Sequence, residues 1–460
     1  MIPKIIHQLQ ATLPPECILT GDDVGSRSAG SWGKQDWIEA KALVRPQSTQ
    51  EVSAVLKICH DAGQTVVTHG GLTGVVQGAK STENDIVLSL ELMNQIEEID
   101  PIGRTATVQA GVILQKLQEA AEQAGLLFPL DLGARGTATL GGNIATNAGG
   151  NHVIRYGMAR EMVLGLEAVL ADGTVISSMN KMLKNNAGYD LKQLFIGSEG
   201  TLGVVTRVVL RLRELPKSHS TAFVALESFE KVTHLLKLMD AALAGTLSAF
   251  EVMWYDFYEL VTTPPAKNRP PLPYDYPYYT IVEAPGSDQD ADVTKFQNAL
   301  ERATEIGLIA DAVVAQSKNE RTAIWEMRDS VTEIFRYDPV FLFDVSLAIR
   351  DMQNYVNEVR ANLQKTWPQH HCSTFGHLGD GNLHFMISAG NDDAETQLKV
   401  EEIVYKPLIK LNGSVSAEHG IGLEKKRYLR WCRSEAEIAL MRTLKQALDP
   451  KGILNPGRVI

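Results

Sequence analysis

Cysteine is scarce in this sequence, and the few cysteines form no motif. The chain of 460 residues contains 4 Cys, which are scattered and never stand in C-x-x-C spacing. The sequence therefore predicts neither a disulfide framework nor a thiolate metal site, and it is typical of a reducing compartment. Acidic residues outnumber basic ones by 55 to 44, and the net charge of -11 argues against nucleic acid or an anionic membrane surface as a partner.

Long apolar runs are also missing. No run of about 18 apolar residues is present, so no membrane span is expected. The first residues lack the apolar core of a secretory signal and the Arg/Ser-rich character of a transit peptide, which predicts a cytoplasmic location. With 44% hydrophobic and 22% charged residues, the chain has enough apolar material for folded cores, and its length predicts two or three domains.

Short apolar segments alternate with amphipathic ones, and glycines stand at the junctions. This pattern predicts an α/β or α+β fold with ligand-binding loops. The expected strands are 42–46, 65–68, 85–90, 105–112, 163–170, 203–212, 220–226, 278–283 and 344–349. The expected helices are 5–11, 52–61, 113–125, 229–244, 290–306, 352–367 and 434–448, and the Pro-rich stretch 263–277 is expected to be a surface loop. We predict domains at 1–215 and 216–425, followed by a C-terminal segment at 426–460.

Three glycine-rich segments indicate a binding site for a large phosphate-bearing cofactor. They are His69-Gly-Gly-Leu-Thr-Gly74, Gly133 to Gly150, and Ile196-Gly-Ser-Glu-Gly-Thr-Leu-Gly203. Consecutive glycines let backbone N–H groups converge on an anion, because no Cβ blocks the approach. Each pair of glycines by itself is typical of a turn, but three such segments so close together favour the cofactor. None has the spacing of a Rossmann or Walker motif.

These segments resemble the FAD-binding domain of vanillyl-alcohol oxidase-type flavoproteins, in the branch of the D-2-hydroxyacid dehydrogenases. The resemblance runs nearly end to end and rests on Phe128-Pro-Leu-Asp-Leu-Gly-Ala134, Gly141-Gly-Asn-Ile-Ala-Thr-Asn-Ala-Gly-Gly150, Arg155-Tyr-Gly157, and the stretch from Gly188 to Gly203. It implies an α+β fold, in which a FAD-binding domain of two subdomains is joined to a substrate domain, the cap, with an antiparallel sheet. The C-terminal segment would return to the FAD domain.

The resemblance also implies which residues contact FAD. They are His69, Gly70, Gly71, Thr73, Gly74, Asp131, Thr137, Gly141, Gly142, Ala145, Asn147, Gly149, Glu199, Gly200, Val204 and Asn455. Some relatives attach FAD covalently through a histidine that follows such a glycine pair. Here His69 precedes the pair, so noncovalent FAD is expected.

The second half contains a set of residues typical of a metal site. Gly379-Asp-Gly-Asn382 is a strong turn sequence, and if it closes a hairpin, His377 and His384 face each other. Two close histidines alone are more often structural, but the Glu418-His419 pair that follows between small residues favours a His₂Glu site for a divalent cation, with Zn²⁺ the expected metal. The family carries divalent-metal ligands at these three places, and its catalytic base corresponds to His419.

A third motif offers groups for the substrate. Arg328 and Thr332 are four residues apart, and the expectation is that they share one helix face. A guanidinium group suits a carboxylate, although an arginine in this pattern alone is more often a solvated surface residue. The family resemblance assigns both residues, together with Asn382, to substrate binding.

Two departures from the family pattern concern the substrate. D-2-hydroxyglutarate dehydrogenases carry a lysine where this chain has Leu342, and an asparagine where it has Met386. Apolar side chains give no partner to a second carboxylate, and burying that charge unpaired is costly. The sequence therefore predicts oxidation of a D-2-hydroxy acid with a short or apolar tail, such as D-lactate, by hydride transfer to FAD. D-2-hydroxyglutarate dehydrogenase, or a subunit of a glycolate or 2-hydroxyacid oxidase, is the alternative.

The resemblance leaves the partners of the enzyme less defined. The expected partners are a small 2-hydroxy acid and an electron acceptor, which is a quinone, an electron-transfer flavoprotein or a cytochrome. A homodimer is a family-level expectation. A zinc hydrolase with a structural glycine-rich domain is a rival class, which a flavin absorption spectrum would exclude.

Overall fold

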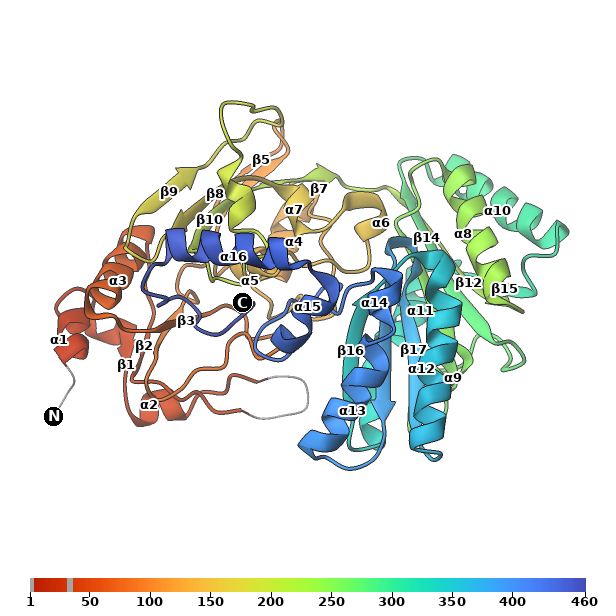
Figure 1. The fold of residues 1–460 in the computed structure, drawn as a ribbon. Helices are drawn as coiled ribbons and strands as arrows, with labels where there is room; N and C mark the ends of the chain where they lie inside the picture. The colour runs from red at the N-terminus through yellow and green to blue at the C-terminus, as the bar shows by residue number, and fades with distance from the viewer. Residues whose placement is uncertain (1–3, 31–35) are drawn as a thin grey trace. The chain divides into compact units, whose positions relative to one another are not determined.

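The computed structural model describes residues 4–30 and 36–460. The chain divides into two compact units, and Figure 1 traces it from red at the N-terminus to blue at the C-terminus. Unit 1 comprises residues 1–150, 157–215 and 418–460, and unit 2 comprises residues 151–156 and 216–417. Each unit is described by itself below.

The described residues of unit 1 form three small sheets, with helices around them. Its strands are β1 (Ile18–Leu19), β2 (Ala42–Val44), β3 (Val66–His69), β4 (Ile86–Ser89), β5 (Ile96–Asp100), β6 (Thr105–Gln109), β7 (Leu126–Leu127), β8 (Val163–Val169), β9 (Val175–Ser178), β10 (Val204–Arg211) and β11 (Arg213–Glu214). Its α-helices are α1 (Lys4–Gln10), α2 (Asp22–Gly25), α3 (Thr49–Ala62), α4 (Leu114–Gln123), α5 (Leu140–Ala145), α7 (Ala159–Met162), α15 (Leu429–Cys432) and α16 (Glu435–Leu448).

The helix α3 shows how the sequence fixes this unit locally. Its N-cap Ser48 accepts a hydrogen bond from the backbone N–H of Glu51, and Gly63 ends the helix in the left-handed conformation. Val52, Val55, Leu56 and Cys59 are buried at helical spacing, so one face of the helix packs into the core. That core also receives β2, β3 and β4, whose sheet has the order β1-β2-β4-β3.

The C-terminal residues complete this sheet. Leu454 forms a parallel bridge with Val66 of β3, and the N–H of Asn455 donates to the carbonyl of Val66. The second sheet of unit 1 is antiparallel, in the order β5-β6-β10-β8-β9, and β11 pairs with β7. The last segment of the chain is thus part of the unit that carries the glycine-rich loops.

Unit 2 contains one large antiparallel sheet. Its strands are β12 (Ser218–Leu226), β13 (Ala249–Trp254), β14 (Tyr278–Gly286), β15 (Asp311–Val314), β16 (Phe341–Ser346), β17 (His371–His377) and β18 (Asn382–Ser388). Its α-helices are α6 (Val153–Tyr156), α8 (Phe229–Leu243), α9 (Tyr255–Thr262), α10 (Gln289–Glu305), α11 (Lys318–Asp329), α12 (Met352–Thr366), α13 (Ala394–Tyr405) and α14 (Leu408–Leu411).

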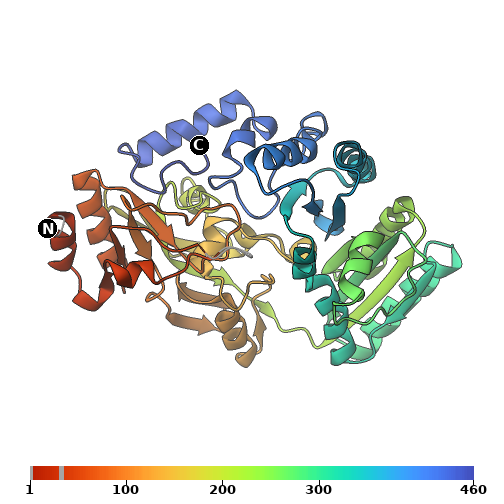
Figure 2. The same cartoon turned by 90° about the horizontal axis from the view of Figure 1, so that it is seen from below.

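The strand order of this sheet determines which side chains meet. Within the described residues the order is β15-β12-β14-β13-β17-β18-β16, so β13 lies directly beside β17 although more than a hundred residues separate them. Helices α8 and α10 lie side by side along β12 and β14, which both views show (Figures 1 and 2). Helices α12 and α13 pack together near β16.

The predicted α+β class with an antiparallel sheet in the second part is confirmed, but the bounds of several expected elements differ from the structure. The strand expected at 344–349 runs from Phe341 to Ser346, because it pairs along β18 and stops where β18 begins at Asn382. Residues 151–156 belong to unit 2, and residues 418–425 belong to unit 1. Among the described residues, no helix is both long and apolar enough to cross a membrane.

Candidate active site

A tight hairpin carries the two histidines of the predicted metal site. After His377, residues Leu378–Asp380 form a short 3₁₀ turn, and Gly381 adopts a positive φ of 86° before β18 starts. The ring centroids of His377 and His384 are 5.4 Å apart and the rings stand nearly edge to face. The prediction that this turn closes a hairpin and brings the two imidazoles together is confirmed.

Glu418 completes a possible metal site with these histidines. His377, His384 and Glu418 each offer one ligand atom, and all these atoms lie within 4.8 Å of one another. The chain just before Glu418 is held by Asp344, whose Oδ2 accepts hydrogen bonds from Ser416 Oγ and the Ala417 N–H, both at 3.2 Å. Two imidazoles and a carboxylate are a donor set typical of a catalytic divalent cation with open positions, so the residues fit a metal.

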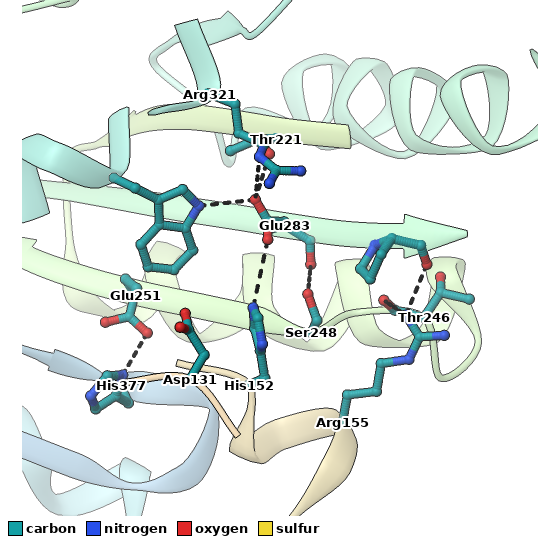
Figure 3. Close-up of polar contacts among 12 residues, drawn as sticks. Asp131, His152, Arg155, Thr221, Thr246, Ser248, Glu251, Glu283, Arg321 and His377 are labelled. Atoms are coloured by element: carbon teal, nitrogen blue, oxygen red, sulfur yellow. Dashed lines mark hydrogen bonds and ion pairs between the residues drawn. The ribbon is translucent and has the colours of Figure 1, made fainter. Parts of the chain in front are cut away.

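Glu251 of β13 is a site residue that the sequence did not reveal. It lies opposite His377 in the sheet register, is 1% exposed, and accepts a hydrogen bond from His377 Nδ1 at 2.7 Å (Figure 3). Its other oxygen accepts from Arg328 Nε at 2.9 Å. Burial by itself would raise the pKa of Glu251, but its interactions with His377 and Arg328 more than offset this and hold the pKa below the ordinary value.

Arg328 lies at the candidate metal site, but Thr332 does not share its helix face. Helix α11 ends at Asp329 and a separate 3₁₀ segment begins at Val331, so the expected i, i+4 relation is wrong. Ser330, with ψ of 38°, breaks the helix between the two residues. Arg328 is buried and its Nη2 lies 3.0 Å from His377 Nε2, whereas Thr332 is exposed.

Asn382 is buried at the start of β18. Its Nδ2 donates to Asp344 Oδ1 at 2.8 Å, while its Oδ1 is buried without a hydrogen-bond partner. An unpaired buried acceptor is costly and is a place where a ligand donor would fit. Its predicted contact with substrate stays a prediction, as do the assignments of Arg328, Thr332 and His419.

The two departures from the family pattern lie side by side. Leu342 of β16 and Met386 of β18 are cross-strand partners, and the next pair on the same face, two residues along each strand, is Asp344 and His384. Leu342 is 37% exposed and Met386 is buried at 2%. An apolar pair therefore lies about 7 Å along the strand from a candidate metal ligand.

A glycine-lined pocket in unit 1 suits FAD. Gly70, Gly71, Thr137 and Thr139 line it, in the loop that follows β3 and in the segment that leads to α5. A Cβ on Gly71 would come within 2.2 Å of the Thr137 carbonyl, and one on Gly70 within 2.7 Å of Thr139 Oγ1. The buried Thr139 Oγ1 has no hydrogen-bond partner in the described structure, as expected for a hydroxyl that would donate to an acceptor oxygen of a cofactor.

The other predicted FAD residues lie at loops and ends of elements within unit 1. Thr73 and Gly74 follow β3, Asp131 follows β7, Gly142 and Ala145 lie in α5, Gly149 follows α5, Gly200 precedes β10, and Val204 begins β10. Gly141 packs against Ala110, where a Cβ would lie 2.7 Å from the alanine Cβ. Asn147 Oδ1 accepts from the Arg160 N–H. Their contacts with FAD stay predictions.

The side chains of two of these residues are hydrogen-bonded within the chain. The carboxylate of Glu199 accepts from the backbone N–H groups of Ile421 and Gly422 at 2.7 and 2.8 Å, and burial raises its pKa. Asn455 accepts from the Thr68 N–H and donates to the Glu199 carbonyl. Both therefore tie the C-terminal segment to β3 and the loop before β10.

His69 is a buried histidine at the end of β3. Its Nε2 lies 2.7 Å from the Ala79 carbonyl, and burial lowers the pKa of the imidazole to about 4. A neutral buried histidine does not take up a proton between pH 6.5 and 4, whereas the unfolded chain does, so acid favours unfolding.

We expect this histidine to cost the fold up to about 3 kcal/mol as the pH falls from 6.5 to 4, at about 1.36 kcal/mol per pH unit. Urea unfolding of the wild-type protein and of His69→Asn at several pH values measures the difference. The free energy of unfolding of the variant should fall less over this range, and parallel pH profiles would contradict the assignment.

Known proteins that resemble this chain cover both of its parts. The family described as FAD linked oxidases, C-terminal domain, matches residues 215–459, and the family described as FAD binding domain matches residues 40–178. The D-2-hydroxyglutarate dehydrogenase of Xanthomonas citri pv. viticola is 38% identical over 465 residues, which cover 99% of this chain and 97% of that protein.

Two further relatives are a second D-2-hydroxyglutarate dehydrogenase and a putative D-lactate dehydrogenase. The mitochondrial D-2-hydroxyglutarate dehydrogenase of Bos taurus is 39% identical, over 92% of this chain and 78% of that protein. A putative mitochondrial D-lactate dehydrogenase of Schizosaccharomyces pombe is 38% identical, over 92% of this chain and 84% of that protein.

Solved structures match the fold over nearly the full length. Alkyldihydroxyacetonephosphate synthase has a TM-score of 0.75 at 16% identity, covering 99% of this chain and 85% of the other. Substrate-bound p-cresol methylhydroxylase has a TM-score of 0.76 at 16% identity, covering 99% and 96%. At these identities the likeness shows the fold alone.

Proposed function

Because this chain belongs to the family of FAD-linked oxidases, we propose that it oxidises D-2-hydroxyglutarate to the corresponding 2-oxo acid with the help of a divalent metal. The chain is a FAD-linked dehydrogenase of D-2-hydroxy acids. The observation that carries the metal-assisted reaction is the set of His377, His384 and Glu418, whose ligand atoms lie within 4.8 Å of one another.

Several residues of the chain would each have a separate role in the reaction. His419 takes the proton of the substrate hydroxyl as the general base, and Arg328 donates hydrogen bonds to the substrate carboxylate. His377, His384 and Glu418 would hold a divalent cation, which would supply Lewis acidity that lowers the pKa of the hydroxyl. The glycine-lined pocket would hold FAD noncovalently, and FAD would supply the acceptor for the hydride from C2.

The observations support two different substrate tails. Most of the named relatives are D-2-hydroxyglutarate dehydrogenases, which supports the diacid. The apolar pair of Leu342 and Met386 supports the second candidate, a D-lactate-like acid with a short tail. If the diacid is preferred, its distal carboxylate must find a cation elsewhere than at these two positions.

Anaerobic reduction of the flavin by a panel of D- and L-2-hydroxy acids tests the proposal. We expect D-acids to bleach the flavin and L-acids to leave it oxidised. A higher kcat/KM for D-2-hydroxyglutarate than for D-lactate favours the first candidate and the reverse order favours the second. A flavin that no D-2-hydroxy acid reduces would contradict the proposed reaction. Peroxide formation in air would identify an oxidase instead of a dehydrogenase.

A substitution at Leu342 reports whether this position faces the substrate tail. We expect Leu342→Lys to raise kcat/KM for D-2-hydroxyglutarate relative to D-lactate by about fivefold, because a partly exposed ion pair contributes about 1 kcal/mol. Leu342→Met, which changes shape but adds no charge, is the matched control and should leave the ratio near that of the wild type. An unchanged ratio in the lysine variant would show that the tail lies elsewhere.

Four further expectations accompany the proposal. FAD should be released into solution when the protein is denatured, as a noncovalent cofactor is. The electron acceptor is a quinone, an electron-transfer flavoprotein or a cytochrome, and reduction of each by the substrate-reduced enzyme distinguishes them. A cytoplasmic location and a homodimer remain predictions from the sequence.

A further inference from the structure

We infer that Glu251 is the positioning residue of the metal site, and that it presets His377 in the neutral tautomer that offers the Nε2 lone pair to a metal. Glu251 lies on β13, directly opposite His377 of β17, and both side chains are buried. This inference rests on the metal-assisted function proposed above. Glu251 itself would touch neither the metal nor the substrate.

The hydrogen bonds around His377 determine which nitrogen carries the proton. An arginine can only donate, so Arg328 Nη2, at 3.0 Å from His377 Nε2, requires a lone pair on that nitrogen. The proton of the neutral ring then resides on Nδ1, where Glu251 accepts it at 2.7 Å. Both neighbours therefore favour the same tautomer, in which Nε2 offers its lone pair.

The same carboxylate also fixes the guanidinium group. Glu251 Oε2 accepts from Arg328 Nε at 2.9 Å, while Oε1 serves His377, so one buried side chain orients two site residues. A ligating histidine that donates its second N–H to a carboxylate is a more basic and better oriented ligand, and losing that carboxylate typically weakens metal binding 10- to 100-fold. Glu251 is thus suited to set both the metal affinity and the direction of Arg328.

Glutamine cannot replace this carboxylate, because Glu251 has to accept two hydrogen bonds. The amide of Glu251→Gln has one acceptor oxygen and one NH₂ group, so one of the two donors would meet another donor. If the NH₂ group faces His377, the imidazole must move its proton to Nε2 and loses the lone pair for the metal. If the NH₂ group faces Arg328, the guanidinium is pushed from its place, and in both cases His377 loses its anionic partner.

A second buried glutamate supplies a matched control. Glu283 of β14 lies opposite Ala249, so it projects from the same face of the sheet as Glu251, two residues farther along β13. It is 4% exposed and also has a histidine beside it, with 3.8 Å between its carboxylate and His152 Nε2 (Figure 3). The carboxylate of Glu283 interacts with Thr221, Trp325 and Arg321 instead of a candidate ligand, so Glu283→Gln removes an equally buried charge away from the metal site.

The test is a titration of metal-stripped, FAD-loaded protein with Zn²⁺ alone, in competition with a chromogenic chelator. We expect Glu251→Gln to raise the Kd for Zn²⁺ 10- to 100-fold, with the flavin spectrum unchanged, and Glu283→Gln to keep the wild-type Kd. The inference is overturned if Glu251→Gln binds Zn²⁺ as the wild type does, if both variants weaken binding equally, or if the wild-type protein binds no Zn²⁺.

A measurement on the unaltered protein covers the case in which Glu251→Gln does not fold. Two-bond ¹⁵N–¹H correlation spectra of histidine-labelled, metal-free wild type should show His377, assigned by its loss in His377→Gln, with the proton on Nδ1. A proton on Nε2 would overturn the inference. Neither measurement needs substrate turnover, so a protein that oxidises no hydroxy acid but shows these results loses the proposed function and keeps the role of Glu251.

Discussion

Replacing His419 with Asn should abolish reduction of the bound FAD by the hydroxy acid while the protein keeps its yellow flavin spectrum. General-base catalysis typically contributes a factor of 10² to 10⁴, so the rate constant for anaerobic flavin reduction is expected to fall at least a hundredfold. Asparagine is close to histidine in size but has no group that takes up a proton near neutral pH. Stopped-flow absorbance of the flavin measures the effect directly.

The control for this substitution is a surface histidine outside the glycine-rich and metal-binding segments of the sequence. His234 is exposed on helix α8, and His234→Asn should reduce its flavin at the wild-type rate. A normal rate in His419→Asn would refute the role of His419. A loss of rate that follows loss of FAD would identify a binding defect, which the flavin spectrum reveals before substrate is added.

Replacing His384 with Asn is expected to remove the metal and most of the activity together. With one of three ligands lost, the site keeps an imidazole and a carboxylate, and the bound metal measured by elemental analysis should fall from about one per chain to well below that. Flavin reduction should fall at least a hundredfold, because the hydroxyl then keeps its ordinary high pKa. Treatment of the wild type with a chelator should give the same loss of activity. Added Zn²⁺ should then restore the activity of the wild type but not that of His384→Asn.

The matched control lies in the same hairpin. His371 begins strand β17, is exposed, and stacks on Tyr337 with 3.7 Å between ring centroids, away from the ligand set. His371→Asn should keep both the metal and the activity. If His384→Asn kept a stoichiometric metal, the metal would have to be bound elsewhere, and if it lost the metal but not the activity, the metal would be structural.

The parts of the site that the sequence predicts are those held together by local chain geometry. The sequence Gly379-Asp-Gly-Asn382 favours the turn between His377 and His384, so the pairing of the two imidazoles follows from a few consecutive residues. The N-cap of α3 at Ser48 is predictable for the same reason.

The parts that the sequence does not reveal depend on contacts between distant segments. Glu251 reaches His377 only because β13 pairs with β17, and nothing in the strand Ala249–Trp254 indicates that partner beyond an acid among apolar residues. The hydrogen bond from Asn455 to the Glu199 carbonyl likewise joins residues more than two hundred positions apart. Helical spacing failed for Arg328 and Thr332, because periodicity cannot show that Ser330 ends the helix.

The bridge between Leu454 and Val66 has a consequence for how the protein is made. Strand β3 is complete early in synthesis, but the residues that cover its free edge are added only after the whole of unit 2 has been translated. Until then β3 presents unpaired backbone groups, and an exposed edge strand is a template for association with other chains. This edge of β3 therefore stays open to association with other chains while the ribosome is still translating the second half of the message.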